Sequence, residues 1–362
     1  MIATNDFIPS PYSQKIKNGN FEWSAPSNIA LVKYWGKKHN QIPANPSISF
    51  TLKNCKTITK LSFIKKENNS AFSFELLFNG QPKEDFKPKI QKFFERAFIY
   101  LPFLKEYHFT IDTLNTFPHS SGIASSASGM AALAMNLMSL EKKLNPEISD
   151  YYFYQKASFL ARLGSGSACR SIKGNVVVWG KHTNIKESSD LYGIPFPDAI
   201  HENFNNYQDT ILLVDKGEKQ VSSTLGHDLM CNHPFAENRF AQAHVNLDRL
   251  KAILQNGNIE LFIKIVESEA LTLHAMMMTS MPYFILMKPN TLEIINAIWE
   301  FRNETKIPVC FTLDAGANVH VLYPENVSAS VLQFINKELV GYCQNGQYIC
   351  DEIGNGSELI YG

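Results

Sequence analysis

The sequence lacks several features that would assign it to a common class of protein. Its six cysteines, among 362 residues, form no CxxC pair, which argues against zinc ribbons and thioredoxin-like redox sites. No charge is in excess, because 34 Lys and Arg balance 34 Asp and Glu. A general nucleic-acid-binding protein needs surplus cations, so nucleic acid is not an expected partner. No apolar run is long enough to span a bilayer and the first residues resemble no secretory signal, so we expect a cytoplasmic protein without membrane contact.

The length of the chain suggests either two lobes or one large α/β domain. A change of pattern between about 181 and 207 favours a second, α+β lobe, and we set an N-terminal extension at 1–20 and the boundary at 190. In the first lobe, residues 21–190, periodicity predicts strands at 21–33, 47–52, 57–64, 71–78, 107–113 and 174–179, and helices at 86–100, 122–140 and 149–163. In the second lobe, residues 191–362, it predicts strands at 210–214, 309–313 and 319–323, and helices at 234–255, 259–277, 291–306 and 327–337.

Serine and glycine are concentrated between Pro118 and Gly129, directly before an Ala-rich helix. Small residues at a helix start let the backbone approach an anion, and the first-turn N–H groups can then bind phosphate. The hydroxyls of Ser125 and Ser126 could contact phosphate oxygens or Mg²⁺. Each serine alone could equally be an ordinary helix cap. Five serines and two glycines between 120 and 129 favour the anion site, although no Gly-Lys-Ser/Thr follows, so the segment is not a Walker loop.

Other polar segments contain possible ligands for anions. Gly164 to Arg170 carries two glycines, two serines and an arginine that could bind a carboxylate or phosphate with two hydrogen bonds, or could form a surface ion pair. Lys33 and Lys37 crowd the end of an apolar strand, which could also be an ordinary solvated strand end. Asp314 lies on a turn between two strands, where it either caps the turn or deprotonates a hydroxyl.

Together these segments resemble the GHMP superfamily of small-molecule kinases and, within it, the mevalonate-diphosphate decarboxylases. The matching motifs are APSNIA at 25–30 with KYWGK at 33–37, GIASSASG at 122–129, GSGSACRS at 164–171 and DAGAN at 314–318. VSST at 221–224 resembles the family's substrate-diphosphate loop. GSGSACRS is specific to the decarboxylase branch, whereas the SSA motif is shared by all members.

The resemblance implies a fold and a reaction. The fold would have a ribosomal-S5-like N-terminal lobe and a ferredoxin-like C-terminal lobe, with the active site in the cleft between them. The reaction would be ATP-dependent decarboxylation of mevalonate 5-diphosphate to isopentenyl diphosphate, in isoprenoid biosynthesis, through phosphorylation of the 3-hydroxyl and with Mg²⁺. Family members are commonly homodimers, so a homodimer is expected.

The resemblance also implies roles for individual residues. Asp314, Lys33 and Arg170 would be catalytic: the first orients or deprotonates the C3 hydroxyl, the second polarises the reacting groups, and the third binds the carboxylate. The remaining substrate contacts would come from Asn28, Tyr34, Lys37, Ser165, Ser167, Ser222 and Ser223. The ATP phosphates would contact Gly122, Ala124, Ser125, Ser126 and Ser128, with Mg²⁺ at Ser126. Segments 54–60 and 113–117 are candidates for the adenine pocket.

The motifs also depart from the family pattern. His119, Ser120 and Ser121 replace the usual Thr-Ala-Ala before the glycine loop, and 37–46 is shorter than the family's loop beside the terminal phosphate of the substrate. Mevalonate 5-phosphate therefore remains an alternative substrate, and a GHMP kinase without decarboxylation is a second alternative. A non-catalytic metabolite-binding descendant would have lost the acid or a lysine, and this sequence retains both.

Overall fold

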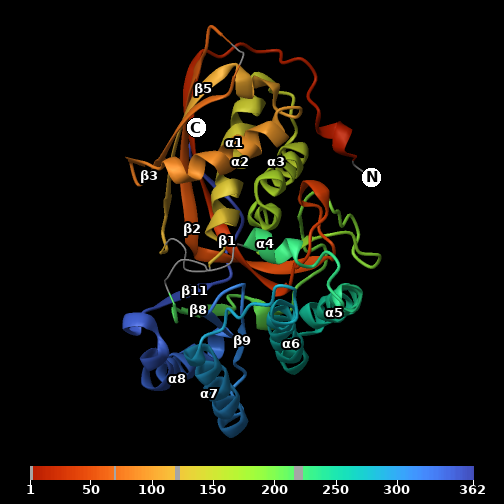
Figure 1. The fold of residues 1–362 in the computed structure, drawn as a ribbon, viewed down its shortest axis with the longest axis vertical. Helices are drawn as coiled ribbons and strands as arrows, with labels where there is room; N and C mark the ends of the chain where they lie inside the picture. Colours follow the sequence, from red (N-terminus) through yellow and green to blue (C-terminus); the bar gives the residue numbers. More distant parts are fainter. Residues whose placement is uncertain (1–2, 69–70, 119–122, 216–222) are drawn as a thin grey trace.

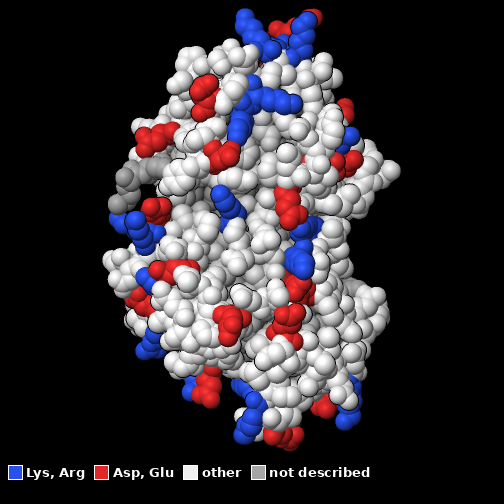
Figure 2. Space-filling model, turned by 180° about the vertical axis from the view of Figure 1, so that it is seen from behind, with Lys and Arg blue, Asp and Glu red and all other residues white. Residues whose placement is uncertain are grey.

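The computed structural model describes residues 3–68, 71–118, 123–215 and 223–362. They form two sheets, each covered by helices, which confirms the predicted α+β class (Figure 1). In the described ranges no helix is both long and apolar enough to cross a membrane. The division near residue 190 stays a prediction. On the face in Figure 2, acidic and basic side chains are interspersed, as the balanced composition suggests.

The larger sheet has eight strands in the order β12-β1-β2-β5-β3-β4, with β6 paired to β2 and β7 to β6. All its pairs are antiparallel except β3 with β5. The last strand comes from the C-terminal end of the chain and pairs with β1, so the chain returns to its first lobe (Figure 1). The strands are β1 (Asn18–Val32), β2 (Ser47–Lys65), β3 (Ser73–Phe78), β4 (Gln81–Pro82), β5 (Tyr107–Asn115), β6 (Val176–Trp179), β7 (Ile194–Pro195) and β12 (Glu358–Tyr361).

The helices α1 (Lys87–Ala97), α2 (Ser125–Leu144) and α3 (Asp150–Gly164) cover one face of this sheet (Figure 1). Helix α2 packs against β1 and β2, and it is apolar on nearly every side because it lies between the sheet and α3. Ser149 caps α3 by accepting a hydrogen bond from the N–H of Tyr152. A short 3-10 helix, Gly166–Ser171, follows α3 and carries Arg170.

The smaller sheet is antiparallel, in the order β11-β8-β10-β9. Its strands are β8 (Gln208–Leu212), β9 (Cys310–Thr312), β10 (Val319–Tyr323) and β11 (Tyr348–Glu352). Helices α6 (Ile259–Met278) and α7 (Pro289–Thr305) pack on β9, and α6 also reaches β1 of the larger sheet. The remaining helices are α4 (Ser223–Asp228), α5 (Ala236–Asn256) and α8 (Ser328–Phe334).

Three local predictions were wrong. Strand β2 is continuous, not two strands, because the carboxylate of Asp351 accepts the N–H groups of Lys53, Asn54 and Cys55 at 3.0, 2.8 and 2.7 Å where a turn was expected. Strands β11 and β12 lie in a region where no strand was predicted. The segment 221–224 was expected to be a loop, but its described part begins helix α4 at Ser223.

Candidate active site

The predicted acid and the predicted lysine face each other between the two sheets. Lys33 follows β1 of the larger sheet, and Asp314 lies on the turn between β9 and β10 of the smaller one. Lys33 Nζ lies 3.4 Å from Asp314 Oδ1. The lysine side chain is 2% exposed, whereas the aspartate side chain is 29% exposed. The pair is therefore buried on its cationic side and open on its acidic side.

The backbone of Lys33 is held by a buried ionic network that the sequence did not indicate. Its N–H donates to Glu269 Oε2 at 2.9 Å, and its carbonyl accepts hydrogen bonds from Asn45 and Arg239. The Arg239 guanidinium donates both terminal groups to the Glu269 carboxylate, at 3.1 and 2.5 Å, and Asn246 donates to it at 2.6 Å. The fully paired carboxylate fixes the end of β1 and thereby the position of the lysine.

Opposing effects act on the pKa of Lys33. Burial lowers the pKa of its ammonium group, and the carboxylates of Asp314 and Glu269 oppose that change. The charge of Arg170 lowers the pKa of Lys33 further, because this second cation lies near the lysine. His274 holds the backbone of Asp314, because its Nε2 lies 3.1 Å from the carbonyl oxygen of Asp314 and the ring is buried.

Arg170 is a buried guanidinium with neutral hydrogen-bond partners. Its Nε donates to Asn28 Oδ1 at 3.2 Å and its Nη1 donates to Ser47 Oγ at 2.5 Å. Asn28 is held in turn by its amide, which donates to Ser171 Oγ at 2.8 Å. Among the described residues, no carboxylate lies within 4 Å of Arg170, which is 3% exposed. A buried cation without an ion-pair partner is suited to binding an anionic ligand.

The short helix α4 adds an aromatic and polar wall. The ring of His227 lies 4.2 Å from that of Tyr34 and 4.6 Å from that of Trp35. Its Nδ1 accepts the N–H of Gly36, and burial lowers its pKa to about 3, so the ring is neutral. Asp228 pairs with Lys37 at 3.3 Å. The six-residue helix is held by these contacts, since Ser, Thr, Gly and Asp favour it little.

The serine segment reaches the same region from the start of α2. Ala124 caps the helix in a left-handed conformation, with φ of 43°. Ser126 Oγ lies 3.2 Å from Ser165 Oγ, which joins the helix start to the residues before Arg170. Ser128, in contrast, is fully buried and its hydroxyl pairs with Thr57 at 2.6 Å, so its side chain does not face the open end of the helix. Gly122 and Ser222 lie outside the described residues, as does the side chain of Ser223.

The structure brings most of the remaining predicted residues to this region. The ring of Tyr34 packs at a tilt against Trp179, which also lies beneath the Arg170 guanidinium. The backbone carbonyl of Ser167 accepts a hydrogen bond from the side-chain amide of Asn28. Cys169 is buried. We name the group formed by Lys33, Arg170 and Asp314, with the residues that hold them, the inter-sheet site.

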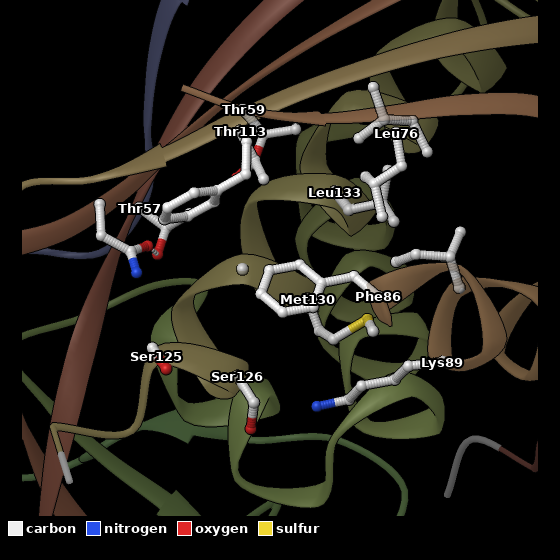
Figure 3. Close-up of a pocket in the computed structure, with 15 residues that line it drawn as sticks. Thr57, Thr59, Leu76, Phe86, Lys89, Thr113, Ser125, Ser126, Met130 and Leu133 are labelled. Atoms are coloured by element: carbon white, nitrogen blue, oxygen red, sulfur yellow. Dashed lines mark hydrogen bonds between the residues drawn. The ribbon is translucent and has the colours of Figure 1, made fainter. Parts of the chain in front are cut away.

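A largely apolar pocket of about 140 Å³ opens beside Ser125 and Ser126 (Figure 3). Met130 and Leu133 of α2 form one wall, and Phe86 and Lys89 approach from the start of α1. Four residues from the two segments expected to flank adenine line the strand side: Thr57, Thr59, Thr113 and Asn115. The serine pair therefore lies between a largely apolar pocket and the segment that precedes Arg170.

Sequence reasoning missed Glu269, Arg239, His227 and His274. Glu269, Arg239 and His274 lie on helices that were predicted as ordinary amphipathic sequence, whereas His227 lies on helix α4, which was not predicted. Each acts through a residue far away along the chain. Buried ionisable residues within a predicted helix are the only local signal, and that signal does not distinguish an active-site network from a structural ion pair.

Two protein-family models together match most of the chain. The diphosphomevalonate decarboxylase-like N-terminal domain matches residues 25–190, and the mevalonate 5-diphosphate decarboxylase C-terminal domain matches residues 210–356. A diphosphomevalonate decarboxylase of Gibberella zeae is 30% identical over 322 residues, which are 83% of this chain and 80% of the relative.

Solved structures agree with these matches. The mevalonate diphosphate decarboxylase from Staphylococcus aureus superposes with a TM-score of 0.80 at 28% identity, over 95% of this chain and 98% of the other. A related structure, a complex with MVAPP, AMPPCP and magnesium, superposes with a TM-score of 0.81 at 27% identity, over 95% of this chain and all of the other.

Proposed function

Because the chain belongs to the diphosphomevalonate decarboxylase family, we propose that the inter-sheet site carries out ATP-dependent decarboxylation of mevalonate 5-diphosphate. The observation that carries the proposal is the placement of two buried cations, Lys33 and Arg170, beside one partly exposed carboxylate, Asp314. A substrate with a hydroxyl, a carboxylate and a diphosphate needs an acceptor for its proton and cations for its charges.

Asp314 is the proton acceptor in this proposal. Its carboxylate is open to solvent on one side, so a substrate hydroxyl can approach it while Lys33 remains beneath. The ammonium group of Lys33 neutralises the negative charge that develops on the substrate oxygen. The Glu269–Arg239 network holds the lysine backbone so that this geometry exists before the substrate binds.

Arg170 binds the substrate carboxylate. The buried guanidinium has neutral partners, and an incoming carboxylate would supply the missing counter-charge. Asn28 holds the plane of the guanidinium through its hydrogen bond to Nε. Tyr34, Lys37, Ser165, Ser167, Ser222 and Ser223 are proposed to contact the substrate phosphates.

The start of α2 fits the phosphates of ATP. A twenty-residue helix begins at two serines after a left-handed Ala124, and its first N–H groups face outward from the helix end. Gly122, Ala124, Ser125, Ser126 and Ser128 remain the proposed phosphate segment, Ser128 through its backbone, with Mg²⁺ beside Ser126. The adjoining apolar pocket is proposed to hold the adenine (Figure 3). When bound, ATP with Mg²⁺ supplies the phosphoryl group that turns the hydroxyl into a better leaving group.

The test is an assay that follows ADP and CO₂ together, with mevalonate 5-diphosphate and mevalonate 5-phosphate compared side by side. Equal release of ADP and CO₂ from the diphosphate is expected. The same result from the monophosphate alone would make the enzyme a phosphomevalonate decarboxylase. Release of ADP without CO₂ would identify a small-molecule kinase. If neither ADP nor CO₂ is released, the proposed catalysis is refuted. We also propose that the protein is a cytoplasmic homodimer. Analytical ultracentrifugation of the purified chain tests whether it is a dimer.

A further inference from the structure

A second cavity, of about 420 Å³, lies in the first lobe beside the segment that carries Arg170. Helix α3 contributes Tyr151, Tyr154 and Gln155 to it, and the chain around β7 contributes an apolar wall of Ile194, Pro195, Phe196 and Pro197. The size falls within the range of small-molecule sites. None of its residues belongs to the inter-sheet site, so the proposed reaction leaves the cavity unexplained.

The side chains around this cavity combine aromatic, apolar and cationic groups. Lys173 Nζ lies 4.4 Å from the centroid of the Tyr154 ring, and Lys186 lines the same cavity. Glu187 is a carboxylate among the lining residues, so one acid accompanies two cations. This lining is suited to a small molecule with an aromatic or apolar part that packs on the tyrosines and prolines, and an anionic group that contacts the lysines.

One lining residue is a buried polar side chain without a partner. Gln155 is 9% exposed, and its Oε1 accepts no hydrogen bond from the described residues. An amide oxygen buried without a donor is costly and is usually satisfied by a ligand or by ordered water. Gln155 is therefore a lining residue whose amide oxygen still lacks a donor.

The cavity is linked to the inter-sheet site through Ser158, which also lines it. The hydroxyl of Ser158 donates to the carbonyl of Cys169 at 2.9 Å and accepts the N–H of Gly193 at 2.9 Å. Cys169 directly precedes Arg170, and Gly193 directly precedes the apolar wall at Ile194. A molecule that displaces this wall would act on the segment that holds the guanidinium.

We propose that this cavity is a second ligand site for a small organic anion with a flat apolar body, and that its occupancy changes the affinity of the inter-sheet site for substrate. The binding part stands on the cavity and its side chains alone. The coupling part rests on the proposed role of Arg170.

The probe for binding is 8-anilinonaphthalene-1-sulfonate, a flat aromatic sulfonate, added to the full chain with AMPPCP and mevalonate 5-diphosphate at saturation. We expect fluorescence titration to show one bound probe per chain. Lys173→Glu should weaken that binding about tenfold, whereas Lys264→Glu, the same charge change at an exposed position on α6, should not. Gln155→Leu, which removes the unpartnered amide, should also weaken it.

Absence of probe binding with both ligands at saturation, or equal effects of the two lysine variants, would overturn the binding proposal. The coupling is tested by calorimetric titration of mevalonate 5-diphosphate with and without the probe. We expect the dissociation constant to change by about fivefold or more, and this change to disappear in Lys173→Glu. An unchanged constant with the probe bound would overturn the coupling. No binding of mevalonate 5-diphosphate under either condition would count against the proposed function, while the probe comparison still decides the second site.

Discussion

Two buried lysine–carboxylate pairs in this chain differ in how completely they are closed. In the helical layer, Lys156 of α3 meets Glu141 of α2 at 2.5 Å, with side chains 0% and 1% exposed. Tyr12 of the N-terminal segment donates to the same carboxylate at 3.3 Å. In the inter-sheet site, Lys33 and Asp314 lie 3.4 Å apart, and the acid is 29% exposed. The first pair is sealed, and the second leaves room for another molecule.

The difference indicates which pair stabilises the fold and which serves the reaction. A sealed pair has lost its water, so removing one partner leaves an uncompensated buried charge. An open pair keeps part of its hydration on the acidic side, and a substrate hydroxyl can replace that water. The same comparison applies to two buried arginines, because Arg239 is paired with Glu269 whereas Arg170 has neutral partners.

The largest expected effect comes from removing the charge of the open acid. Asp314→Asn should lower kcat about a thousandfold or more, because the amide cannot accept the hydroxyl proton. AMPPCP binding should change little, and the free energy of unfolding should fall less than when the sealed pair is broken, since water reaches the acidic side of this pair. Near-normal turnover would contradict the assigned role.

Breaking the sealed pair should have the opposite pattern. Lys156→Met should lower the free energy of unfolding by about 3 kcal/mol, because Glu141 would be left buried without its cation. The kcat of the folded enzyme should be unchanged. The matched control is the double variant Lys156→Met with Glu141→Leu, which should recover most of the lost stability in urea titrations. A loss of turnover in the single variant without loss of stability would reverse the comparison.

The contrast between these pairs could be anticipated from sequence only in part. Helix periodicity located α2 and α3, and the serine cluster at 120–129 pointed to the start of α2 as an anion site. The resemblance to a family brought Lys33, Arg170 and Asp314 together, which no local pattern could do for residues so far apart. The structure adds which of them are buried and which partners they have.

What escaped prediction depended on long-range contacts. Strand β2 continues past Lys53 because Asp351 satisfies its backbone from the C-terminal part of the chain. Helix α4 forms from a poor helical sequence because His227 packs between aromatic rings. Glu269 lies on a helix that was predicted correctly, but its pairing with Arg239 needs the packing of α5 against α6.

The two arginines provide the next test. Arg170→Ala should raise the dissociation constant of mevalonate 5-diphosphate about a hundredfold and alter AMPPCP binding far less, because the carboxylate would lose its cation. Stability should be unchanged or higher, since an unpaired buried charge is removed. Arg239→Ala should instead destabilise the fold. Calorimetry and urea unfolding of both variants measure these effects, and equal losses for both ligands would make Arg170 structural.

The smallest expected effect is a pH dependence of stability that arises beside the open pair. Burial lowers the pKa of His274 to about 4, from about 6.5 for an ordinary histidine. Below pH 6.5 the unfolded chain therefore binds a proton that the folded chain does not, and stability is lost as the pH falls toward 4. This histidine alone accounts for about 2 kcal/mol at pH 5.

His274→Gln should remove that contribution, because glutamine keeps a donor for the Asp314 carbonyl but takes up no proton. The free energy of unfolding of the variant should consequently fall less between pH 7 and pH 5 than that of the original chain, by about 2 kcal/mol. The exposed His39→Gln is the matched control and should follow the original chain. Parallel pH profiles for all three proteins would mean that His274 takes up its proton in the folded state as readily as in the unfolded chain.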